Sequence, residues 1–542
     1  MWVNERAGAT GRQISKRLCQ CIGLSSLVLI PNYNDLLSGG QSARMHVPYP
    51  LTNISIAQIT DILAVGVLLF AVRELTRRTR FYPAARLFVM MFAPPYLIER
   101  TRLLIPFAIT DGVIVLTGVL WAGVLLLIVL NSPVLYRHVI RIGDTIGIFF
   151  AVFGLISIGQ LIWMIPWKPG SQEVTAEWSR THQQPRVHPK IVWIVFDELS
   201  YDQLFEHRAH DLTLPSFDRL RKESNLYTDV QPAGYKTVKV IPSLLTGRLI
   251  DDIRYRFSDK QVVRYADTGR WAQLTGAGTI FNDARKSGWR TAIVGWYNPY
   301  CTVYGDALDS CYWTYEDPLG IDTAQGTSYW NNIQRPVKEI VTQIYSPEIE
   351  REQVCDFGVV QRVKSYLDLI EHTQNVLEGD QADFVFLHLP VPHPPAIWDR
   401  LNDRFDNKCE NSYVSSLALA DHTLGNIVAI LRRSPRWEDT TVVVQGDHSW
   451  RINLWNSMAG WTDEDDQASR DEFDPRPALL IHNAGQTQPE TDGRALSLLF
   501  VHDALEDVLQ GKTVQPVTQR PAQTVPATAV VRRVSSAGAS SR

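Results

Sequence analysis

The sequence is poor in cysteine, with six in 542 residues, and it has no excess of basic residues, with 53 Lys and Arg against 57 Asp and Glu. So few cysteines exclude a disulfide scaffold. A formal net charge of −4 argues against a dedicated nucleic-acid binder, which would be basic. Internal repeats are also lacking, and an apolar content of 45% excludes intrinsic disorder. The mean hydropathy of −0.10 averages two very different parts of the chain.

Five apolar segments lie in the first third of the chain. They are residues 18–31, 56–72, 87–98, 107–131 and 145–167. The last two carry one charge between them, and each is long enough to cross a hydrocarbon core of about 30 Å. The second contains Asp61, the first is short and the third has two consecutive prolines, so a signal-like or interfacial segment is the alternative for the first and third. The sequence predicts an N-terminal α-helical transmembrane domain of about five spans over residues 1–167.

Basic residues between the segments predict the orientation. If all five segments span, three basic clusters fall on one side of the membrane, which the positive-inside rule makes the cytoplasm. The clusters are Arg6, Arg12, Lys16 and Arg17; Arg73, Arg77, Arg78 and Arg80; and Arg137 and Arg141. Everything after Trp167 then lies outside. This predicts a multi-pass protein of a bacterial inner (plasma) membrane, with its C-terminal domain on the periplasmic, extracytoplasmic side.

The rest of the chain divides into three parts. Residues 168–189 are polar and contain three prolines, which indicates a linker. Residues 190–511 alternate strand patterns with amphipathic helix patterns, which predicts an α/β domain. Residues 512–542 are rich in Thr, Pro, Ala, Val and Ser and predict a disordered tail.

The cysteines of the α/β domain are even in number. Cys301, Cys311, Cys355 and Cys409 suit two disulfides in an oxidising compartment. Their spacing does not fix the pairing, although the short separation favours a bridge between the first two. No CxxC pair occurs among them, which disfavours a zinc site built from these four residues.

Three apolar runs, typical of strands buried on both faces, lead into acidic or imidazole side chains. Residues 191–196 precede Asp197 and Glu198, residues 384–387 precede His388 and His393, and residues 440–444 precede Asp447 and His448. Ligands gather at the carboxyl ends of strands in an open α/β sheet, so these are candidate metal ligands or catalytic groups. For any one of them a capping or turn role is the alternative. His388, next to a buried strand, suits a structural role better than a catalytic one.

Residues 235–248 indicate the start of a helix, with Thr237 at its N-terminus. An N-cap is the plain interpretation of such a Thr, but a helix N-terminus also holds anions. Its hydroxyl is a weak nucleophile at neutral pH, so catalysis would require a metal ion. Lys236 or Lys239 could neutralise a bound oxyanion, with a solvated surface lysine as the alternative for either. Asp421, on an amphipathic helix face, suits a buried hydrogen-bonding role.

These motifs resemble the alkaline phosphatase/sulfatase superfamily, and within it the membrane-anchored phosphoethanolamine and phosphoglycerol transferases. The resemblance covers about residues 190–510 and implies a central mixed sheet flanked by helices. The motifs are FDELSYD (196–202), LPSFDRLRKES (214–224), SGWRTAIVGWY (287–297), HLPVPHPP (388–395) and GDHS (446–449). The five-span anchor is similar to those transferases too.

The residue at the nucleophile position separates the subclasses. Sulfatases carry a Cys or Ser there for conversion to formylglycine, whereas this sequence has Thr237, which cannot be converted. Thr followed five residues later by Pro242 resembles the phosphoethanolamine transferases. Their first metal ligand is typically Glu, so the choice between Asp197 and Glu198 stays open, with Asp197 favoured.

The resemblance implies a two-step transfer through a phosphorylated Thr237. Asp197, Thr237, Asp447 and His448 would bind a divalent cation, with one or two ions in all and Zn²⁺ or Mn²⁺ suited to these ligands. His393 would stabilise the phosphoryl oxygens or protonate the leaving group. The implied partners are a membrane lipid donor and a lipid or cell-envelope glycan acceptor. A phosphodiesterase or phosphatase with the same residues is the first alternative, and a non-catalytic membrane scaffold is the second.

Overall fold

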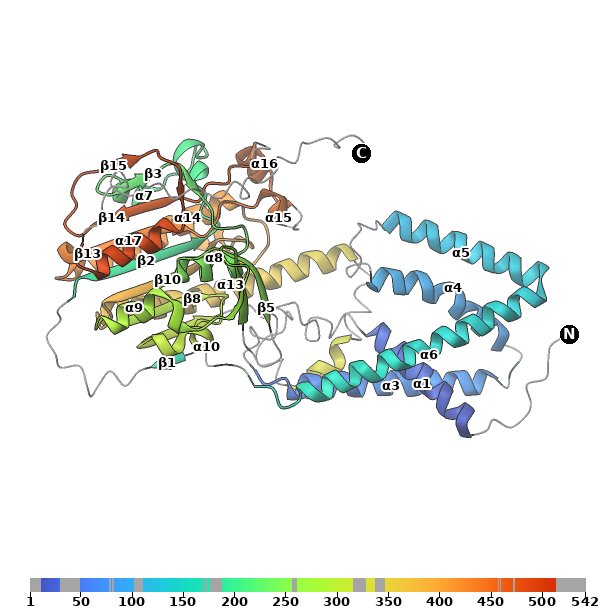
Figure 1. Ribbon diagram of the computed structural model, residues 1–542. Helices are drawn as coiled ribbons and strands as arrows, with labels where there is room; N and C mark the ends of the chain where they lie inside the picture. Colours follow the sequence, from blue (N-terminus) through green and yellow to red (C-terminus); the bar gives the residue numbers. More distant parts are fainter. Residues whose placement is uncertain are drawn as a thin grey trace. The chain divides into compact units, whose positions relative to one another are not determined.

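The computed structural model describes residues 11–29, 49–77, 79, 82–101, 111–168, 170, 173–175, 188–255, 261–314, 328–336, 347–456, 458, 460–470 and 473–512. The chain forms two compact units (Figure 1). The N-terminal unit comprises Met1–Pro169 and Asp317–Pro347, and the C-terminal unit comprises Gly170–Glu316 and Glu348–Arg542. Each unit is described in turn.

The N-terminal unit is a bundle of long helices. These are α1 (Gly11–Val28), α3 (Thr52–Arg77), α4 (Tyr82–Thr101), α5 (Asp111–Asn131) and α6 (Pro133–Met164). Each of the five predicted segments falls on one of them. Within the described residues, α3, α5 and α6 are long and apolar enough to cross a membrane, as is α14 (Tyr413–Arg433) of the C-terminal unit. Because α14 is largely buried in the core of that unit, it is not counted as a span. The predicted membrane-anchored N-terminal domain is confirmed.

Helix α1 is less apolar than its neighbours because it packs mainly against protein. A Cβ atom on Gly23 would lie 2.2 Å from the carbonyl oxygen of Phe150 in α6, and one on Gly66 of α3 would lie 2.9 Å from the Cα of Ile22. Small residues at such crossings let helix backbones approach closely. The Ser25 hydroxyl donates to the carbonyl oxygen of Ile62, 2.8 Å away. Because α1 contacts other helices, it does not need the long apolar run of a helix that faces lipid, and Ser and Gly are tolerated in it.

Basic side chains meet at one end of the bundle. Arg17 near the start of α1 pairs with Glu74 near the end of α3, at 3.1 Å. Arg86 in the first turns of α4 pairs with Asp144 of α6 at 2.9 Å. Glu74 also pairs with Arg77 at 3.5 Å. The predicted basic cluster before the first segment and the one after the second segment thus lie at the same end.

The C-terminal unit is built on a nine-stranded mixed sheet, in the order β1-β9-β8-β10-β2-β13-β14-β3-β15. Its strands are β1 (Glu173–Thr175), β2 (Lys190–Asp197), β3 (Asn225–Tyr227), β8 (Thr291–Trp296), β9 (Ser310–Thr314), β10 (Phe384–Pro392), β13 (Thr440–Gly446), β14 (Leu479–His482) and β15 (Glu490–Asp492). Neighbours β9, β8, β10, β2 and β13 run parallel, and β14 is antiparallel to β13. The three predicted apolar strands are therefore adjacent at the centre of the sheet. Strand β1 pairs antiparallel with β9 at the edge, within the segment predicted as a linker.

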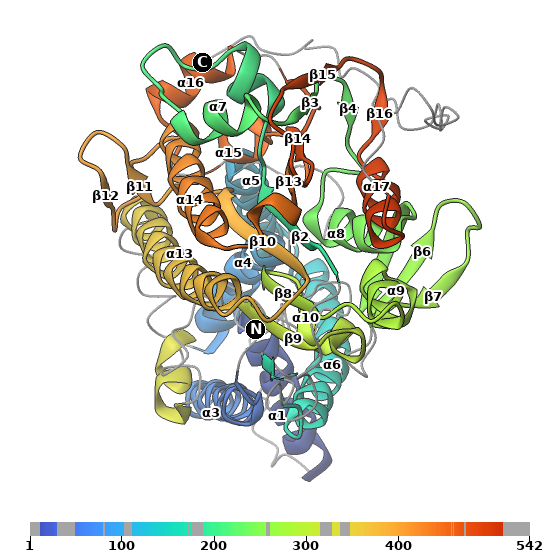
Figure 2. The same cartoon turned by 90° about the vertical axis from the view of Figure 1, so that its left-hand side faces the viewer.

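Helices cover both faces of this sheet, as the sequence predicts (Figure 2). On one side lie α7 (Pro215–Arg221), α13 (Pro347–Glu378) and α14, and on the other α8 (Thr237–Thr246), α9 (Ile280–Lys286) and α17 (Phe500–Leu509). Side chains of alternate residues of β2 pack on opposite faces of the sheet. Val192, for example, joins the core under α14, whereas Trp193 packs edge-on against Phe386 at 5.2 Å. Burial on both faces explains the unbroken apolar runs.

The remaining elements of the C-terminal unit are short. They are β4 (Val230–Gln231), β5 (Ile250–Tyr255), β6 (Gln261–Tyr265), β7 (Trp271–Gln273), β11 (Trp398–Asp399), β12 (Arg404–Phe405), β16 (Leu496–Ser497), α10 (Tyr300–Tyr304), α15 (Ile452–Asn456), α16 (Asp463–Ser469), the π-helix Asp202–Glu206, and 3₁₀ turns at Gly276–Gly278, Gly305–Ala307 and Trp437–Asp439.

Asp421 of α14 acts as the predicted hydrogen-bonding group. Leu214 at the N-cap of α7 has no side chain that can cap the helix. The Asp421 carboxylate instead accepts the backbone N–H groups of Ser216 and Phe217, at 2.9 and 2.8 Å. A negative charge at a helix N-terminus satisfies free N–H groups and the helix dipole. This cap fixes the segment that resembles the superfamily helix.

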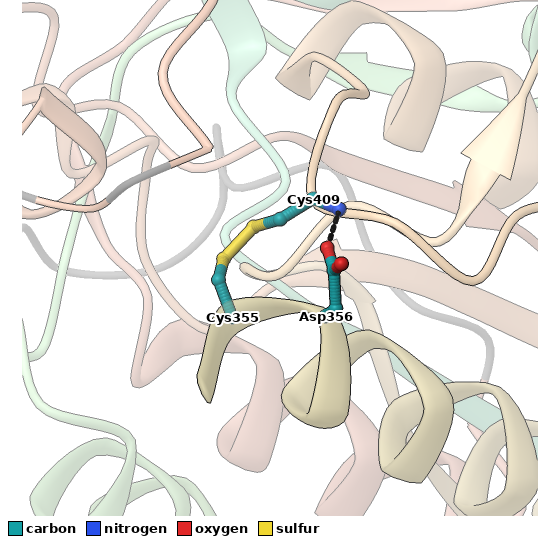
Figure 3. The surroundings of a disulfide bond; sticks show 3 residues. All are labelled: Cys355, Asp356 and Cys409. Carbon is teal, nitrogen blue, oxygen red and sulfur yellow. Dashed lines mark hydrogen bonds between the residues drawn. A yellow bond between two sulfur atoms is a disulfide. The ribbon is translucent and has the colours of Figure 1, made fainter. Parts of the chain in front are cut away.

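Two disulfides form in the C-terminal unit, as the sequence predicts. Cys301 pairs with Cys311 and Cys355 with Cys409, each with a Cα–Cα distance of 5.6 Å. Figure 3 shows the second bridge, where the backbone N–H of Cys409 donates to the carboxylate of Asp356 at 2.8 Å. That bridge ties α13 to the loop before α14.

Residues 317–347, inside the predicted catalytic domain, group with the N-terminal unit instead. Their described part contains a helix at 329–336. The Tyr329 hydroxyl donates to the Thr60 hydroxyl of α3 at 3.2 Å. The predicted tail, apart from Lys512, lies outside the described residues.

Candidate active site

The sheet brings the three chemistry-bearing strand ends together. Asp197 is the last residue of β2, and Gly446 of β13 pairs with Phe196, so Asp447 follows at the same edge. His388 of β10 pairs with Val195 on one side and with Gly295 on the other. Because these strands are parallel, their carboxyl ends share one edge, where ligands bind in open α/β sheets.

Four predicted site residues converge at this edge. The Thr237 hydroxyl lies 3.3 Å from Asp197 Oδ2 and 3.5 Å from His448 Nε2. His448 Nε2 is 3.3 Å from Asp447 Oδ2 and 3.7 Å from Asp197 Oδ1. Thr237 is 6% exposed and the other three are fully buried. The predicted ligand set is therefore a single buried cluster.

The unused lone pairs of this cluster point to a cation. The Nδ1 atom of His448 contacts its neighbour Ser449 O at 3.0 Å, and that of His388 contacts Trp296 O at 2.9 Å. A carbonyl oxygen accepts, so each Nδ1 carries the proton and each Nε2 keeps a lone pair. Asp447 Oδ2 and His388 Nε2 are buried and have no hydrogen-bond partner. Buried polar atoms are normally satisfied, and a histidine ligand commonly donates its other N–H to a carbonyl.

Two overlapping groups of ligand atoms could hold an ion. One is Asp197, Glu198 and His448, and the other is Asp197, His388 and Asp447, with atoms within 4.8 Å of one another in each. Carboxylate oxygen and imidazole nitrogen suit Zn²⁺ and Mn²⁺. The residues present thus fit one or two divalent cations, and His388 belongs to the candidate ligands as well as to the strand.

A glycine makes room for the support of His388. The Tyr300 hydroxyl lies 2.8 Å from His388 Nδ1. A Cβ on Gly295 would lie 2.3 Å from the Tyr300 ring, so only glycine leaves the ring in place. Burial lowers the pKa of His388 to about 4. The imidazole is therefore neutral at pH 7, the state in which it binds metals.

The carboxylates of the cluster repel one another. Burial, together with the charges of Asp447 and Glu198, raises the pKa of Asp197 well above its ordinary value. A pKa shifted by burial and by neighbouring charges is typical of a group in a functional site.

Glu198 is engaged outside the cluster. Its Oε1 accepts Arg451 Nε at 2.5 Å and its Oε2 accepts the indole N–H of Trp455 at 2.6 Å. Because both oxygens have donors, the geometry favours Asp197 as the metal ligand, in line with the sequence-based preference.

The two candidate lysines lie on the first turn of α8. Lys236 is the N-cap residue and is exposed, and the Lys239 ammonium donates to the carbonyl oxygen of Asp251 at 2.6 Å. Neither has a hydrogen bond to the cluster among the described contacts. That either lysine neutralises a bound oxyanion stays a prediction.

His393 follows β10 and lies outside both groups of ligand atoms. Arg362 of α13 holds it: the guanidinium donates to the carbonyl oxygens of His393 and Pro394 at 3.0 and 2.9 Å. Burial, and then the charge of Arg362, lowers the pKa of His393 well below its ordinary value. Stabilising the phosphoryl oxygens or protonating the leaving group stays a prediction for His393.

Sequence reasoning missed Arg362 and Arg451. Arg451 stands four residues after Asp447, and its position after the GDHS motif was the available signal. Arg362 lies within a long amphipathic helix and carries no local signal.

The chain matches the family model described as Sulfatase over residues 189–505. No curated protein matches it. Similar solved structures include the phosphonate monoester hydrolase of Agrobacterium radiobacter, at 14% identity, covering 60% of this chain and 74% of that one, with a TM-score of 0.37. A protein in the alkaline phosphatase superfamily from Vibrio parahaemolyticus is 17% identical, with 62% and 71% covered and a TM-score of 0.35. Murine ectonucleotide pyrophosphatase/phosphodiesterase 5 is 12% identical, with 61% and 96% covered and a TM-score of 0.35.

Proposed function

Because the chain belongs to the sulfatase family, we propose that it is a metal-dependent, membrane-bound phosphotransferase. It would move a phospholipid head group, of the phosphoethanolamine or phosphoglycerol type, to a lipid or cell-envelope glycan. The observation that carries this proposal is the Thr237 hydroxyl, placed between the Asp197 carboxylate and His448 Nε2 at the N-terminus of α8.

The identity of this residue favours phosphoryl chemistry over sulfate hydrolysis. Formylglycine cannot be made from Thr, so the usual sulfatase route is closed at Thr237. A hydroxyl beside a carboxylate and an imidazole lone pair, at the N-terminus of a helix, can instead attack phosphorus.

The chain's own residues divide the work of the first step. Thr237 Oγ1 attacks the phosphorus in line, the bond from phosphorus to the diacylglycerol oxygen breaks, and the departing alkoxide takes a proton. A divalent cation held by Asp197, Thr237, Asp447 and His448, with His388 beside them, would lower the pKa of the hydroxyl and neutralise charge on the phosphoryl group. Asp197 is placed to accept the hydroxyl proton, and His393 is the candidate donor to the alkoxide.

In the second step an acceptor hydroxyl attacks the phospho-threonine. The acceptor's proton passes to His393, the Thr237 oxygen leaves and regains its proton from Asp197, and the head group stays on the acceptor. If water takes the acceptor's place, the same residues perform hydrolysis, so products alone separate a transferase from a hydrolase.

The N-terminal helices suit a reaction between membrane-bound molecules. Tethering holds donor and acceptor at one interface and raises their effective concentration. We propose that the basic end of the bundle faces the cytoplasm. Since α6 begins at that end and leads out of the bundle, the catalytic unit would lie on the periplasmic side of a bacterial inner membrane.

The test uses the full-length protein in lipid nanodiscs with phosphatidylethanolamine or phosphatidylglycerol labelled at phosphorus. We expect diacylglycerol release and label on Thr237, abolished in Thr237→Ala and partly kept in the matched Thr237→Ser. Label released as free phosphoethanolamine or glycerophosphate without an acceptor product would indicate the hydrolase. Equal activity of wild type and Thr237→Ala on every donor would refute the nucleophile.

A further inference from the structure

A phosphoryl group in this site needs positive charge beyond a metal ion. The candidate lysines offer none within the described contacts: Lys236 is exposed, and Lys239 donates to the Asp251 carbonyl. Among the described residues, Arg362 and Arg451 are the arginines whose charges act on Asp197. Arg362 is 1% exposed, and both its terminal nitrogens donate to the backbone carbonyl oxygens around His393.

Arg451 is held at the edge of the site by Glu198. Its Nε donates to Glu198 Oε1 at 2.5 Å, and its Nη2 lies 2.5 Å from the same oxygen. Trp455 donates to Oε2 at 2.6 Å, which orients the carboxylate from the other side. The Nε hydrogen bond thus fixes the guanidinium on this anion, while the buried Nη2 lies close to the same oxygen without a hydrogen bond of its own.

Glu198 is itself immobilised by the ligand loops. Its backbone N–H donates to Asp447 Oδ1 at 3.0 Å, and its carbonyl oxygen accepts the Tyr413 hydroxyl at 2.7 Å. Its backbone has a φ of 70°, a left-handed conformation that costs energy in a non-glycine residue and recurs at functional sites. The anchor of Arg451 is therefore one residue from Asp197 and bonded to Asp447.

The guanidinium keeps a donor edge for a ligand. Arg451 is 23% exposed, whereas Glu198 is fully buried. Nη1 makes no hydrogen bond to any of the described residues.

We infer that Arg451 binds the nonbridging oxygens of the substrate phosphoryl group, with Glu198 and Trp455 as its positioning residues. This inference rests on the proposed function, in which that group sits at Thr237. It assigns the class of ligand as a phosphate ester or free phosphate. It also gives Glu198 a role other than metal binding. Arginine suits this role because its planar fork pairs with phosphate oxygens.

The test measures binding of inorganic phosphate to the metal-loaded, full-length protein in detergent by calorimetry. A hydrogen bond to a charged group contributes about 1.5–3 kcal/mol, so Arg451→Gln should weaken phosphate binding by about 10- to 100-fold, and Arg451→Lys by less. Metal content, measured by mass spectrometry, should stay at the wild-type level. Arg476→Gln is the matched control, because Arg476 pairs with Glu206 and Asp474 and is 21% exposed.

A double-mutant cycle tests the positioning role. Glu198→Gln should weaken phosphate binding, and the double variant with Arg451→Gln should be no weaker than Arg451→Gln alone, since Glu198 acts through Arg451. Wild-type phosphate affinity in Arg451→Gln, loss of its metal, or no phosphate binding by the wild type would each overturn the inference.

The outcome is independent of the lipid assay. A protein that binds phosphate through Arg451 but transfers no head group would refute the proposed function alone. A protein that transfers head groups and binds phosphate normally without Arg451 would refute this inference alone.

Discussion

Replacing Asp447 by Asn should make the metal-free protein more stable. Asp447 Oδ1 accepts two backbone N–H groups, from Glu198 and His448, at 3.0 and 2.8 Å, and an amide oxygen keeps both bonds. Oδ2 has no partner and faces His448 Nε2 at 3.3 Å. The new amide would place an N–H there, opposite acceptors that now face one another.

The magnitude follows from charge and hydrogen bonding. Two like charges about 4 Å apart repel by about 4 kcal/mol at an effective dielectric constant of about 20, an upper limit here because Asp197 can take up a proton instead. A satisfied buried hydrogen bond adds about 1 kcal/mol. We expect Asp447→Asn to raise the free energy of unfolding of the EDTA-treated protein by about 1–3 kcal/mol.

When metal is added, the wild type should become more stable than the Asp447→Asn variant. An ion at 100 times its dissociation constant stabilises the wild type by about 2.7 kcal/mol, and the variant, which lacks an anionic ligand, gains little. Thermal unfolding of the full-length protein in detergent, with EDTA or with Zn²⁺ or Mn²⁺, measures both effects. Asp465→Asn is the control, because that carboxylate is also buried but binds Thr462 and Tyr413 outside the site. Metal should raise the unfolding temperature of this variant as much as that of the wild type. A metal-free Asp447→Asn protein less stable than wild type would refute the reasoning.

Three further predictions concern neighbouring features. Burial is the main cause of the raised pKa of Asp197, so in the folded metal-free protein this carboxyl holds a proton that the unfolded chain releases above the usual pKa of 3.8. The unfolding temperature of the metal-free protein should therefore fall as pH rises from about 4 towards neutrality. Asp197→Asn should flatten that profile. Gly295→Ala should displace the Tyr300 ring from His388 and weaken metal binding by about 10- to 100-fold in a metal titration, whereas wild-type affinity would show that this support is dispensable. Gly23→Leu should separate α1 from α6 and lower the unfolding temperature of the detergent-solubilised protein, while Gly123→Leu, with open space around it, should not.

The central strands and their ligands were predictable because each signal is local. An unbroken apolar run that ends in Asp197, or one followed by Asp447 and His448, specifies both a buried strand and a polar group at its carboxyl end. Parallel pairing then brings residues about 250 positions apart to one edge. The same logic found the membrane spans, where length and apolarity decide.

Features that depend on contacts between distant elements were not predictable. The poor membrane segment at α1 is explained only by its burial between α3 and α6, which no single window of sequence displays. Strand β1 is three residues long and gains its place from pairing with β9. Residues 317–347 group with the N-terminal unit although they lie within the predicted catalytic domain, residues 190–511. In each case tertiary packing overrides the local pattern.

The roles of neighbouring acids show the same limit at the site itself. Asp197 and Glu198 are adjacent in sequence, and their chemistry alone makes either a metal ligand. Their partners separate them: Glu198 is paired with Arg451 and Trp455, whereas Asp197 faces Thr237 and His448. A buried carboxylate that lacks a cation partner must find a proton or a metal ion, so the arginine next to one acid leaves the ion to the other.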